Sequence, residues 1–194
     1  MAATISTIMR IIGGALKRRR LYFPKTTRTR PVTDRAKETI FNVLGTNCEA
    51  AVVLDLFAGS GSLGIEALSR GARQVYFVDH AKAAAVCIER NLKTLSLQAV
   101  SHILTMPIFK AIRKLEKQVK KFNLIFLDPP HNKGLIKKVL RHLDHSDIVL
   151  TFGTIVVGHS NQESLPDHLE TLRYQRNIKI GQTFVSFLIR LDKQ

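Results

Sequence analysis

Short apolar runs alternate with amphipathic segments along the chain from residue 51 to residue 158. The apolar runs cover 51–57, 74–79, 100–105, 122–128 and 154–158, and they have the length and composition of buried strands. The segments between them, 62–70, 81–95, 108–120 and 133–145, carry apolar residues at helical spacing. This alternation predicts an α/β fold with a doubly wound, Rossmann-like sheet that is mostly parallel.

The alternation stops near the C-terminus. Two strand-like runs, 172–180 and 183–191, are separated only by Gly181 and Gln182, which leaves no room for a crossover helix. Strands joined so closely pair antiparallel. We therefore expect a C-terminal antiparallel hairpin at one edge of the sheet.

The N-terminal region has a different pattern. A short β-prone run at 10–12, the turn signal Gly13-Gly14 and a second extended run at 17–23 predict a basic β-hairpin arm that projects from the globular core. Thr33 or Asp34 can then cap a helix that runs to about Leu44. We expect a disordered leader at 1–9, the arm at 10–32 and the globular domain at 33–194.

Charge suggests a partner for this arm. The 30 Lys and Arg against 15 Asp and Glu give a net charge of +15 and a pI near 10.3, which points to a polyanion such as nucleic acid. The candidate phosphate-binding residues are Arg10, Lys17, Arg18, Arg19, Arg20, Arg28, Arg30 and Arg35. No apolar run is long enough to span a membrane, and the histidines lack thiols or carboxylates at ligand spacing, so we expect no metal. Two cysteines cannot build a disulfide framework, which favours the cytoplasm.

A glycine-rich loop follows the first buried strand, in the segment Asp55 to Gly64. Gly59, Gly61 and Gly64 fit the pattern G-x-G-x-x-G, and Asp79 ends the next strand, where a carboxylate can bind ribose hydroxyls. These features alone do not separate a nicotinamide dinucleotide from S-adenosylmethionine. Asp55 favours the second, because a carboxylate beside the loop repels pyrophosphate but attracts a cationic sulfonium and ammonium.

A second constellation, Asp128-Pro129-Pro130-His131, ends the fourth strand. The prolines restrict the backbone, so the turn presents the Asp128 carboxylate and the Pro129 carbonyl in fixed positions. Two such acceptors can hold an exocyclic amino group and stabilise the positive charge that develops on its nitrogen during methyl transfer. Asp128 or water can then take the proton. We therefore expect amino methylation by S-adenosylmethionine.

These motifs resemble a known family. The segments Asp55 to Gly61 and Asp128-Pro-Pro, together with Arg10-Ile-Ile-Gly-Gly, Arg30-Pro-Val-Thr-Asp-Arg and Glu38-Thr-Ile-Phe-Asn, are similar to the D-type bacterial 16S ribosomal RNA guanine-N2 methyltransferases. The resemblance implies a methyltransferase domain that modifies a guanine of small-subunit ribosomal RNA during assembly of the subunit. It implies a helix over Thr33 to Asn42 that helps to close the donor site. We expect a monomer whose donor site contains Thr33, Asp55, Phe57, Gly59, Ser60, Gly61, Asp79 and His80.

Two departures from the family pattern leave alternatives open. His131 stands where the family has an aromatic residue that stacks on the flipped base, and Thr105-Met106-Pro107 lacks the side chain that reads the adenine amino group in many relatives. A related enzyme acting on adenine N6 or on protein is one alternative, and an inactive RNA-binding protein of the same fold is another. An NAD-dependent oxidoreductase needs a second substrate region, for which too little chain follows the fifth strand.

Overall fold

The computed structural model describes residues 9–24, 32–129 and 134–192, and it contains one large sheet of seven strands. The strands lie in the order β5-β4-β3-β6-β7-β9-β8, and the first five run parallel. Their bounds are Val52–Leu56 (β3), Gln74–Asp79 (β4), Ser101–Thr105 (β5), Phe122–Leu127 (β6), Val149–Ser160 (β7), Leu172–Ile180 (β8) and Thr183–Arg190 (β9). The predicted doubly wound, mostly parallel fold is confirmed.

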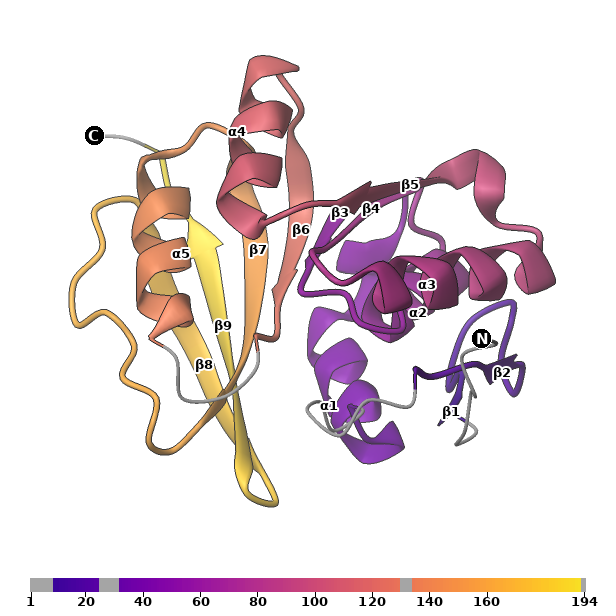
Figure 1. Ribbon diagram of the computed structural model, residues 1–194. Helices are drawn as coiled ribbons and strands as arrows, with labels where there is room; N and C mark the ends of the chain where they lie inside the picture. The colour runs from indigo at the N-terminus through magenta and orange to yellow at the C-terminus, as the bar shows by residue number, and fades with distance from the viewer. Residues whose placement is uncertain (1–8, 25–31, 130–133, 193–194) are drawn as a thin grey trace.

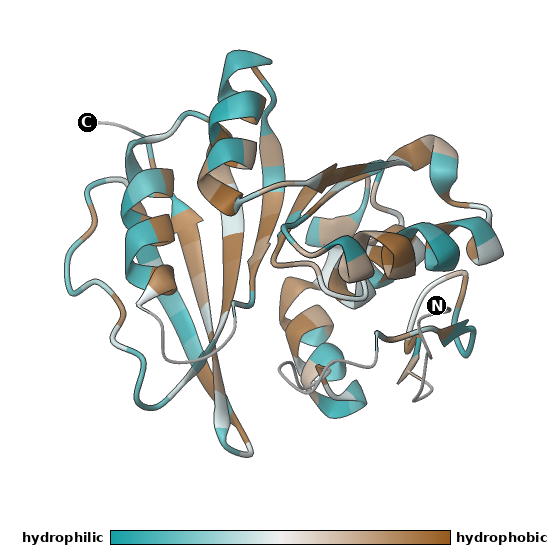
Figure 2. Ribbon diagram, viewed as in Figure 1, coloured by the Kyte–Doolittle hydropathy of each residue, from teal (hydrophilic) through white to brown (hydrophobic). Residues whose placement is uncertain are grey.

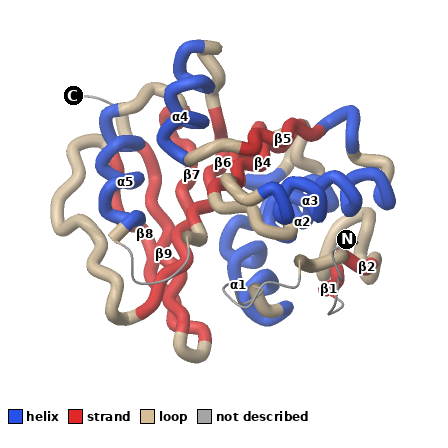
Figure 3. Tube along the Cα trace, viewed as in Figure 1, coloured by secondary structure: helices blue, strands red, loops and turns tan. Residues whose placement is uncertain are grey.

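Helices cover both faces of this sheet (Figures 1 and 3). The helices α1 (Asp34–Leu44), α2 (Ser62–Ser69) and α3 (Lys82–Leu95) pack in one hydrophobic cluster with the sheet. The helices α4 (Ile108–Lys117) and α5 (Leu135–His145) pack in a second cluster on the other face. The central strands are apolar on both faces because each face is covered, as Figure 2 shows.

The strand order reverses direction at the middle of the sheet. From β3 the chain builds outward to β4 and β5 on one side, and it then returns to place β6 and β7 on the other side. The carboxyl ends of β3 and β6 therefore flank a topological switch point, which is where doubly wound sheets bind their ligands.

The predicted C-terminal hairpin is also confirmed. Strands β8 and β9 pair antiparallel, and Gly181 and Gln182 connect them. Its tip extends past α1 at the end of the molecule where the parallel strands terminate (Figure 1). Strand β7 is longer than expected, because its first residues pair with Phe122 before a register shift in the β6 ladder.

The N-terminal hairpin is present, but it does not project from the core as expected. Strands β1 (Met9–Arg10) and β2 (Arg20–Leu21) pair antiparallel. The side chains of Met9, Ile11, Leu21 and Phe23 are buried in the cluster that contains α1, α2 and α3. Burial of this apolar surface holds the hairpin against the domain. Met9, which we expected in the leader, is thus part of the fold.

Within the described ranges, no helix has the length and hydropathy that a membrane span requires. The same ranges contain no group of three or more His, Cys, Asp or Glu residues that could hold a metal ion.

Candidate active site

Three carboxylates lie at the carboxyl ends of three neighbouring strands. Asp55 is in β3, Asp79 is the last residue of β4, and Asp128 directly follows β6. The order β4-β3-β6 places β3 between the other two. The negative charges of Asp128 and Asp79 both act on Asp55, so the three predicted acids form one electrostatic cluster.

The glycine-rich loop adopts left-handed backbone conformations between β3 and α2. The φ angles are +62° at Phe57, +56° at Gly59 and +78° at Gly61. A Cβ atom on Gly59 would meet only the Phe57 carbonyl oxygen, at 4.0 Å, so the loop is open at this point. A positive φ angle strains the backbone of any residue other than glycine, so Phe57 is strained. Such strain is typical of a functional site.

Asp79 holds this loop in place. Its Oδ2 atom accepts a hydrogen bond from the Gly59 amide at 3.0 Å, and its Oδ1 atom accepts one from the Ala81 amide at 2.9 Å. The neighbouring His80 is exposed, with Nδ1 3.7 Å from Asp79 Oδ1. A carboxylate oxygen has room for further hydrogen bonds, so Asp79 can still bind a ligand hydroxyl.

Asp55 is 2% exposed and accepts a hydrogen bond from the Gly64 amide at 3.0 Å. Burial raises the pKa of its carboxyl from 3.8 to about 7, the hydrogen bond from Gly64 opposes this shift, and the charges of Asp128 and Asp79 add to it. A cation close to the cluster would favour the ionised form. The loop and its acids therefore fit a ligand that is cationic and carries hydroxyl groups, as S-adenosylmethionine does.

Ser60, another predicted donor residue, lies close to the N-terminal hairpin. Its side chain is buried, and its hydroxyl contacts the Met9 sulfur at 3.9 Å. Its carbonyl oxygen accepts a hydrogen bond from Asn91 Nδ2 at 2.9 Å. The geometry gives Ser60 a part in joining the loop to α3 and the hairpin.

The Asp128 side chain lies over the backbone of β7. Gly158 is in β7, and a Cβ atom at this position would lie far inside van der Waals contact with Asp128 Oδ1 and 3.1 Å from Asp128 Cγ. The carboxylate can occupy its place only because residue 158 has no side chain. Pro129 is buried, and the other two predicted catalytic residues, Pro130 and His131, lie outside the described residues.

A cavity of about 940 Å³ opens beside Asp128. One wall is the N-terminal part of α1 with the two residues before it, and another is the end of β7 with the tip of the β8–β9 hairpin. Its lining includes Thr33, Arg35, Ala36, Ile40, Leu63, Asp128, Gly158, Lys179 and Phe184. This volume can hold a nucleoside-sized group. Leu63, at the start of α2, and Asp128 join the cavity to the region of the glycine-rich loop.

Thr33 caps α1 as predicted, because its hydroxyl oxygen accepts a hydrogen bond from the Ala36 amide at 3.2 Å. The exposed cations Lys17, Arg18, Arg19 and Arg20 lie on the N-terminal hairpin. Arg10 forms an ion pair with Asp34 at 2.7 Å, so part of its charge is neutralised within the protein. Arg28 and Arg30 lie outside the described residues.

Sequence reasoning missed a buried polar network beneath the hairpin. Glu66 is fully buried and accepts hydrogen bonds from the amides of Ile12 and Gly13. Fully buried Lys37 lies 3.8 Å from Glu66 and donates to the Arg10 carbonyl. A sequence signal existed, because Glu66 stands among the apolar residues at the centre of α2 and Lys37 lies three positions before the core residue Ile40.

Asn91 was missed for a similar reason. It lies on the buried side of α3 with Ile88 and Leu92, and its amide group bonds both the N–H and the carbonyl of Tyr22. A polar residue on an apolar helix face is the signal that could have shown it. The loop, the hairpin and α3 are thus connected through one side chain.

Comparison with known proteins shows the family of this chain. The family model described as "Conserved hypothetical protein 95" matches residues 9–189. YlbH from Bacillus subtilis, a candidate rRNA methyltransferase, is 39% identical over 92% of this chain and 97% of its own length. Ribosomal RNA small subunit methyltransferase D from Escherichia coli is 34% identical over 81% of this chain and 78% of its own.

Solved structures agree with these relatives. The structure of yhhF from Escherichia coli, a candidate methyltransferase, superposes with a TM-score of 0.84 at 31% identity and covers 97% of this chain and 100% of its own. SMU.776, a candidate methyltransferase solved with SAH, superposes with a TM-score of 0.66 at 14% identity over 88% of this chain and 53% of its own, which shows the fold alone.

Proposed function

This chain belongs to the conserved hypothetical protein 95 family and is a methyltransferase of the ribosomal RNA small subunit methyltransferase D type, and from this premise we propose that it methylates the exocyclic N2 amino group of a guanine in 16S ribosomal RNA. The related E. coli enzyme acts, by its name, on small-subunit ribosomal RNA. The net charge of +15 supports RNA as the substrate. A monomer acting on an assembling small subunit completes the proposal.

The observation that carries the choice of base is the position of Asp128 at the cavity. A carboxylate is an acceptor with two oxygens, and the edge of guanine presents two donors side by side, the N1–H and the N2 amino group. Adenine presents an amino group beside the N1 acceptor, which a carboxylate would repel. Asp128 therefore favours guanine over adenine at this position.

S-adenosylmethionine is the cofactor, and when bound it supplies an electrophilic methyl group. The glycine-rich loop, Asp55, Asp79 and Thr33 are the residues that would hold it. Asp128 would accept a hydrogen bond from the guanine amino group, and the carbonyl of Pro129 offers a second acceptor from the same turn. The negative charge of Asp128 stabilises the charge that develops on the amino nitrogen.

The reaction product tests this proposal. Small ribosomal subunits, and separately their naked ribosomal RNA, from a strain that lacks this protein are incubated with the pure protein and S-adenosylmethionine carrying a deuterated methyl group. The nucleosides are then separated by liquid chromatography and identified by mass against standards of each methylated nucleoside. We expect labelled N2-methylguanosine from the wild type and none from Asp128→Ala. Asp128→Asn keeps one acceptor oxygen without the charge, so we expect residual activity. Labelled N6-methyladenosine, or no labelled nucleoside, would sink the proposal.

A further inference from the structure

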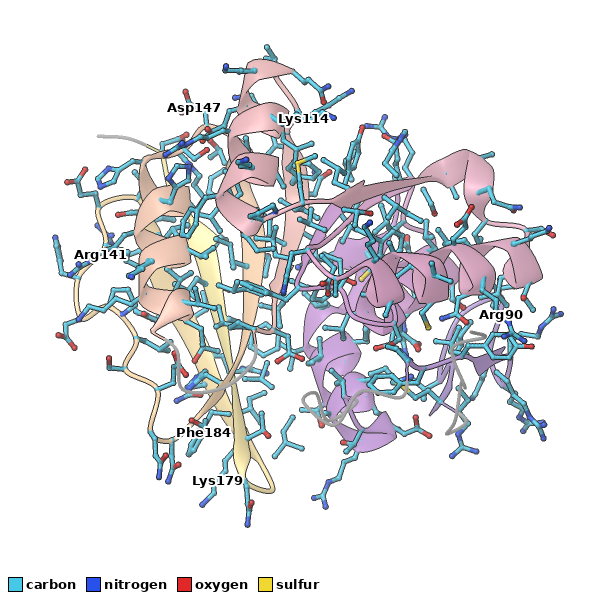
Figure 4. The ribbon with its side chains drawn as sticks, in the orientation of Figure 1. Arg90, Lys114, Arg141, Asp147, Lys179 and Phe184 are labelled. Atoms are coloured by element: carbon cyan, nitrogen blue, oxygen red, sulfur yellow. The ribbon has the colours of Figure 1, made fainter. Side chains whose placement is uncertain are left out.

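Three side chains form a row across the tip of the C-terminal hairpin. Lys179 in β8 pairs in register with Phe184 in β9, and Phe184 pairs with His159 in β7. Register partners on neighbouring strands point to the same face of a sheet, so the three side chains are neighbours. Figure 4 labels Lys179 and Phe184 near this tip, below the end of α5.

The Phe184 ring is held in a defined orientation. It stacks on the His159 imidazole with a centroid distance of 5.7 Å and an angle of 19° between the planes. His159 is 6% exposed, and its ring nitrogens lie 2.9 Å from the Ser186 hydroxyl and 3.1 Å from the Ser160 carbonyl. The histidine therefore supports the phenylalanine from within the sheet. Phe184 itself remains half-buried, so part of the ring faces outward.

A cation lies directly beside this ring. Lys179 is exposed, and its ammonium nitrogen lies 5.8 Å from the Phe184 ring centroid. Both residues line the cavity that contains Asp128, and exposed Arg35 lines it from α1. The cavity lining thus combines a positive residue from each of two walls with the Asp128 carboxylate.

We propose that the tip of the β8–β9 hairpin is a docking platform for the RNA nucleotides that flank the target base, with a flanking base stacked on the side of Phe184 opposite His159 and with Lys179 turned from the ring to the phosphate of that nucleotide. The proposal rests on the proposed function, because it needs an RNA whose target base enters the Asp128 cavity. An aromatic ring with a neighbouring cation is the arrangement by which proteins bind single-stranded nucleic acid. Because residues of the tip line the cavity, a nucleotide next to a base in the cavity would lie close to them.

This platform would also offset the lack of an aromatic residue after Pro130. A histidine at position 131 gives a smaller stacking surface than the aromatic residue expected there. Stacking at Phe184 would order the RNA next to the cavity mouth and so position the target base.

Binding of a 16S ribosomal RNA transcript, measured by filter binding at several salt concentrations, tests the platform. Lys179→Ala should lower the slope of log affinity against log salt by about 0.7, as one lost phosphate contact on a single strand does. Phe184→Leu should weaken binding between about fivefold and 100-fold with the slope unchanged. Phe184→Tyr keeps the ring and should bind like the wild type.

Matched controls come from the opposite end of the molecule. Lys114→Ala removes an exposed lysine of α4, and Phe152→Leu removes an aromatic side chain that is 67% exposed at the far end of β7. Both should bind RNA like the wild type. Unchanged affinity and slope in the tip variants, or equal losses in the controls, would overturn the platform.

The identity of the methylated nucleoside separates this proposal from the proposed function. The binding assay requires no methyl transfer, so the two results are independent. If the wild type methylates a different base while the tip variants bind RNA more weakly, only the base assignment is refuted. A wild type that forms N2-methylguanosine while the tip variants bind normally would refute only the platform.

Discussion

A single missing side chain decides where the Asp128 carboxylate lies. Gly158→Ala would place a methyl group where Asp128 Oδ1 now lies, so the carboxylate must move. A displacement of about 1 Å in a positioned group can cost on the order of 100-fold in rate. We expect kcat to fall by at least about tenfold, while the affinity for S-adenosylmethionine, measured by calorimetry, stays within about twofold of the wild type. A variant with full kcat would show that Asp128 does not need its present position.

Asp55 gives a prediction for pH. The pKa of its carboxyl is about 7 in the folded protein and 3.8 ordinarily, so the folded state binds the extra proton between about pH 4 and pH 7. The contribution of Asp55 to the free energy of unfolding is therefore fully present below about pH 4 and is lost as the pH rises through 7. Asp55→Asn should remove this loss and be more stable than the wild type at pH 8, in denaturant titrations, with a smaller difference at pH 5.

The affinity for S-adenosylmethionine should depend on pH in the opposite direction to the contribution of Asp55 to stability. A cationic ligand favours ionised Asp55, so the wild type should bind S-adenosylmethionine more tightly as the pH rises through 7 and release a proton on binding. The Asn variant should bind about tenfold more weakly at pH 8 and lose this pH dependence. Glu38→Gln, an exposed carboxylate in α1, is the control. Identical pH profiles for Asp55→Asn and the wild type would remove Asp55 from the donor site.

At the scale of single residues, the sequence predicted the three carboxylates better than the residues that contact them. Asp55, Asp79 and Asp128 each follow from a motif at a strand end, and strand topology alone brings them together. The role of Gly158 depends on a contact between two strands that only the register defines. The burial of Ser60 against Met9 depends on a hairpin that was expected elsewhere.

At the scale of elements, the N-terminal hairpin shows where charge misled the prediction. Its arginines suggested a projecting arm, yet Met9 and Ile11 alternate with Arg10, as Leu21 and Phe23 do with Tyr22. That period of two is the pattern of a half-buried strand. The helices and most strands were predicted to within a few residues, because their apolar faces are continuous and well bounded.

Glu66 and Ser69 form the polar attachment of this hairpin to α2, and Glu66 carries its charge. Glu66→Gln would leave one amide of Ile12 or Gly13 facing an NH₂ group and would leave Lys37 with a weaker counter-charge. Removing one partner of a buried ion pair costs on the order of 3 kcal/mol. We expect a loss of about that size in the free energy of unfolding, with faster amide hydrogen exchange in residues 11–23. Glu49→Gln, an exposed carboxylate, should change neither, and a normal exchange rate in the Glu66 variant would refute the attachment.

At the scale of the whole molecule, the fold separates two basic surfaces. The N-terminal hairpin, which carries one group of cations, lies beside α3 and packs with α1 and α3 (Figure 1), while α4, which carries another group, packs on the other face of the sheet. Total charge is visible in the sequence, but its distribution between these surfaces needs the fold. The first surface contacts the glycine-rich loop through Met9 and Ser60, and the Arg10–Asp34 pair joins it to the start of α1, which lines the cavity.

The last prediction compares these two surfaces directly. Replacing Arg18, Arg19 and Arg20 with Ala removes three exposed cations from the hairpin, whose attachment through Glu66 and Asn91 uses backbone groups and should persist. If all three contact phosphates of single-stranded RNA, the salt slope of 16S ribosomal RNA binding should fall by about 2 units. S-adenosylmethionine binding should not change, since the donor residues are untouched. The matched variant replaces Arg113, Lys114 and Lys117 of α4, which are also exposed. Equal losses in both variants would mean that RNA responds only to net charge, and an unchanged slope in the first would exclude the hairpin as the phosphate-binding surface.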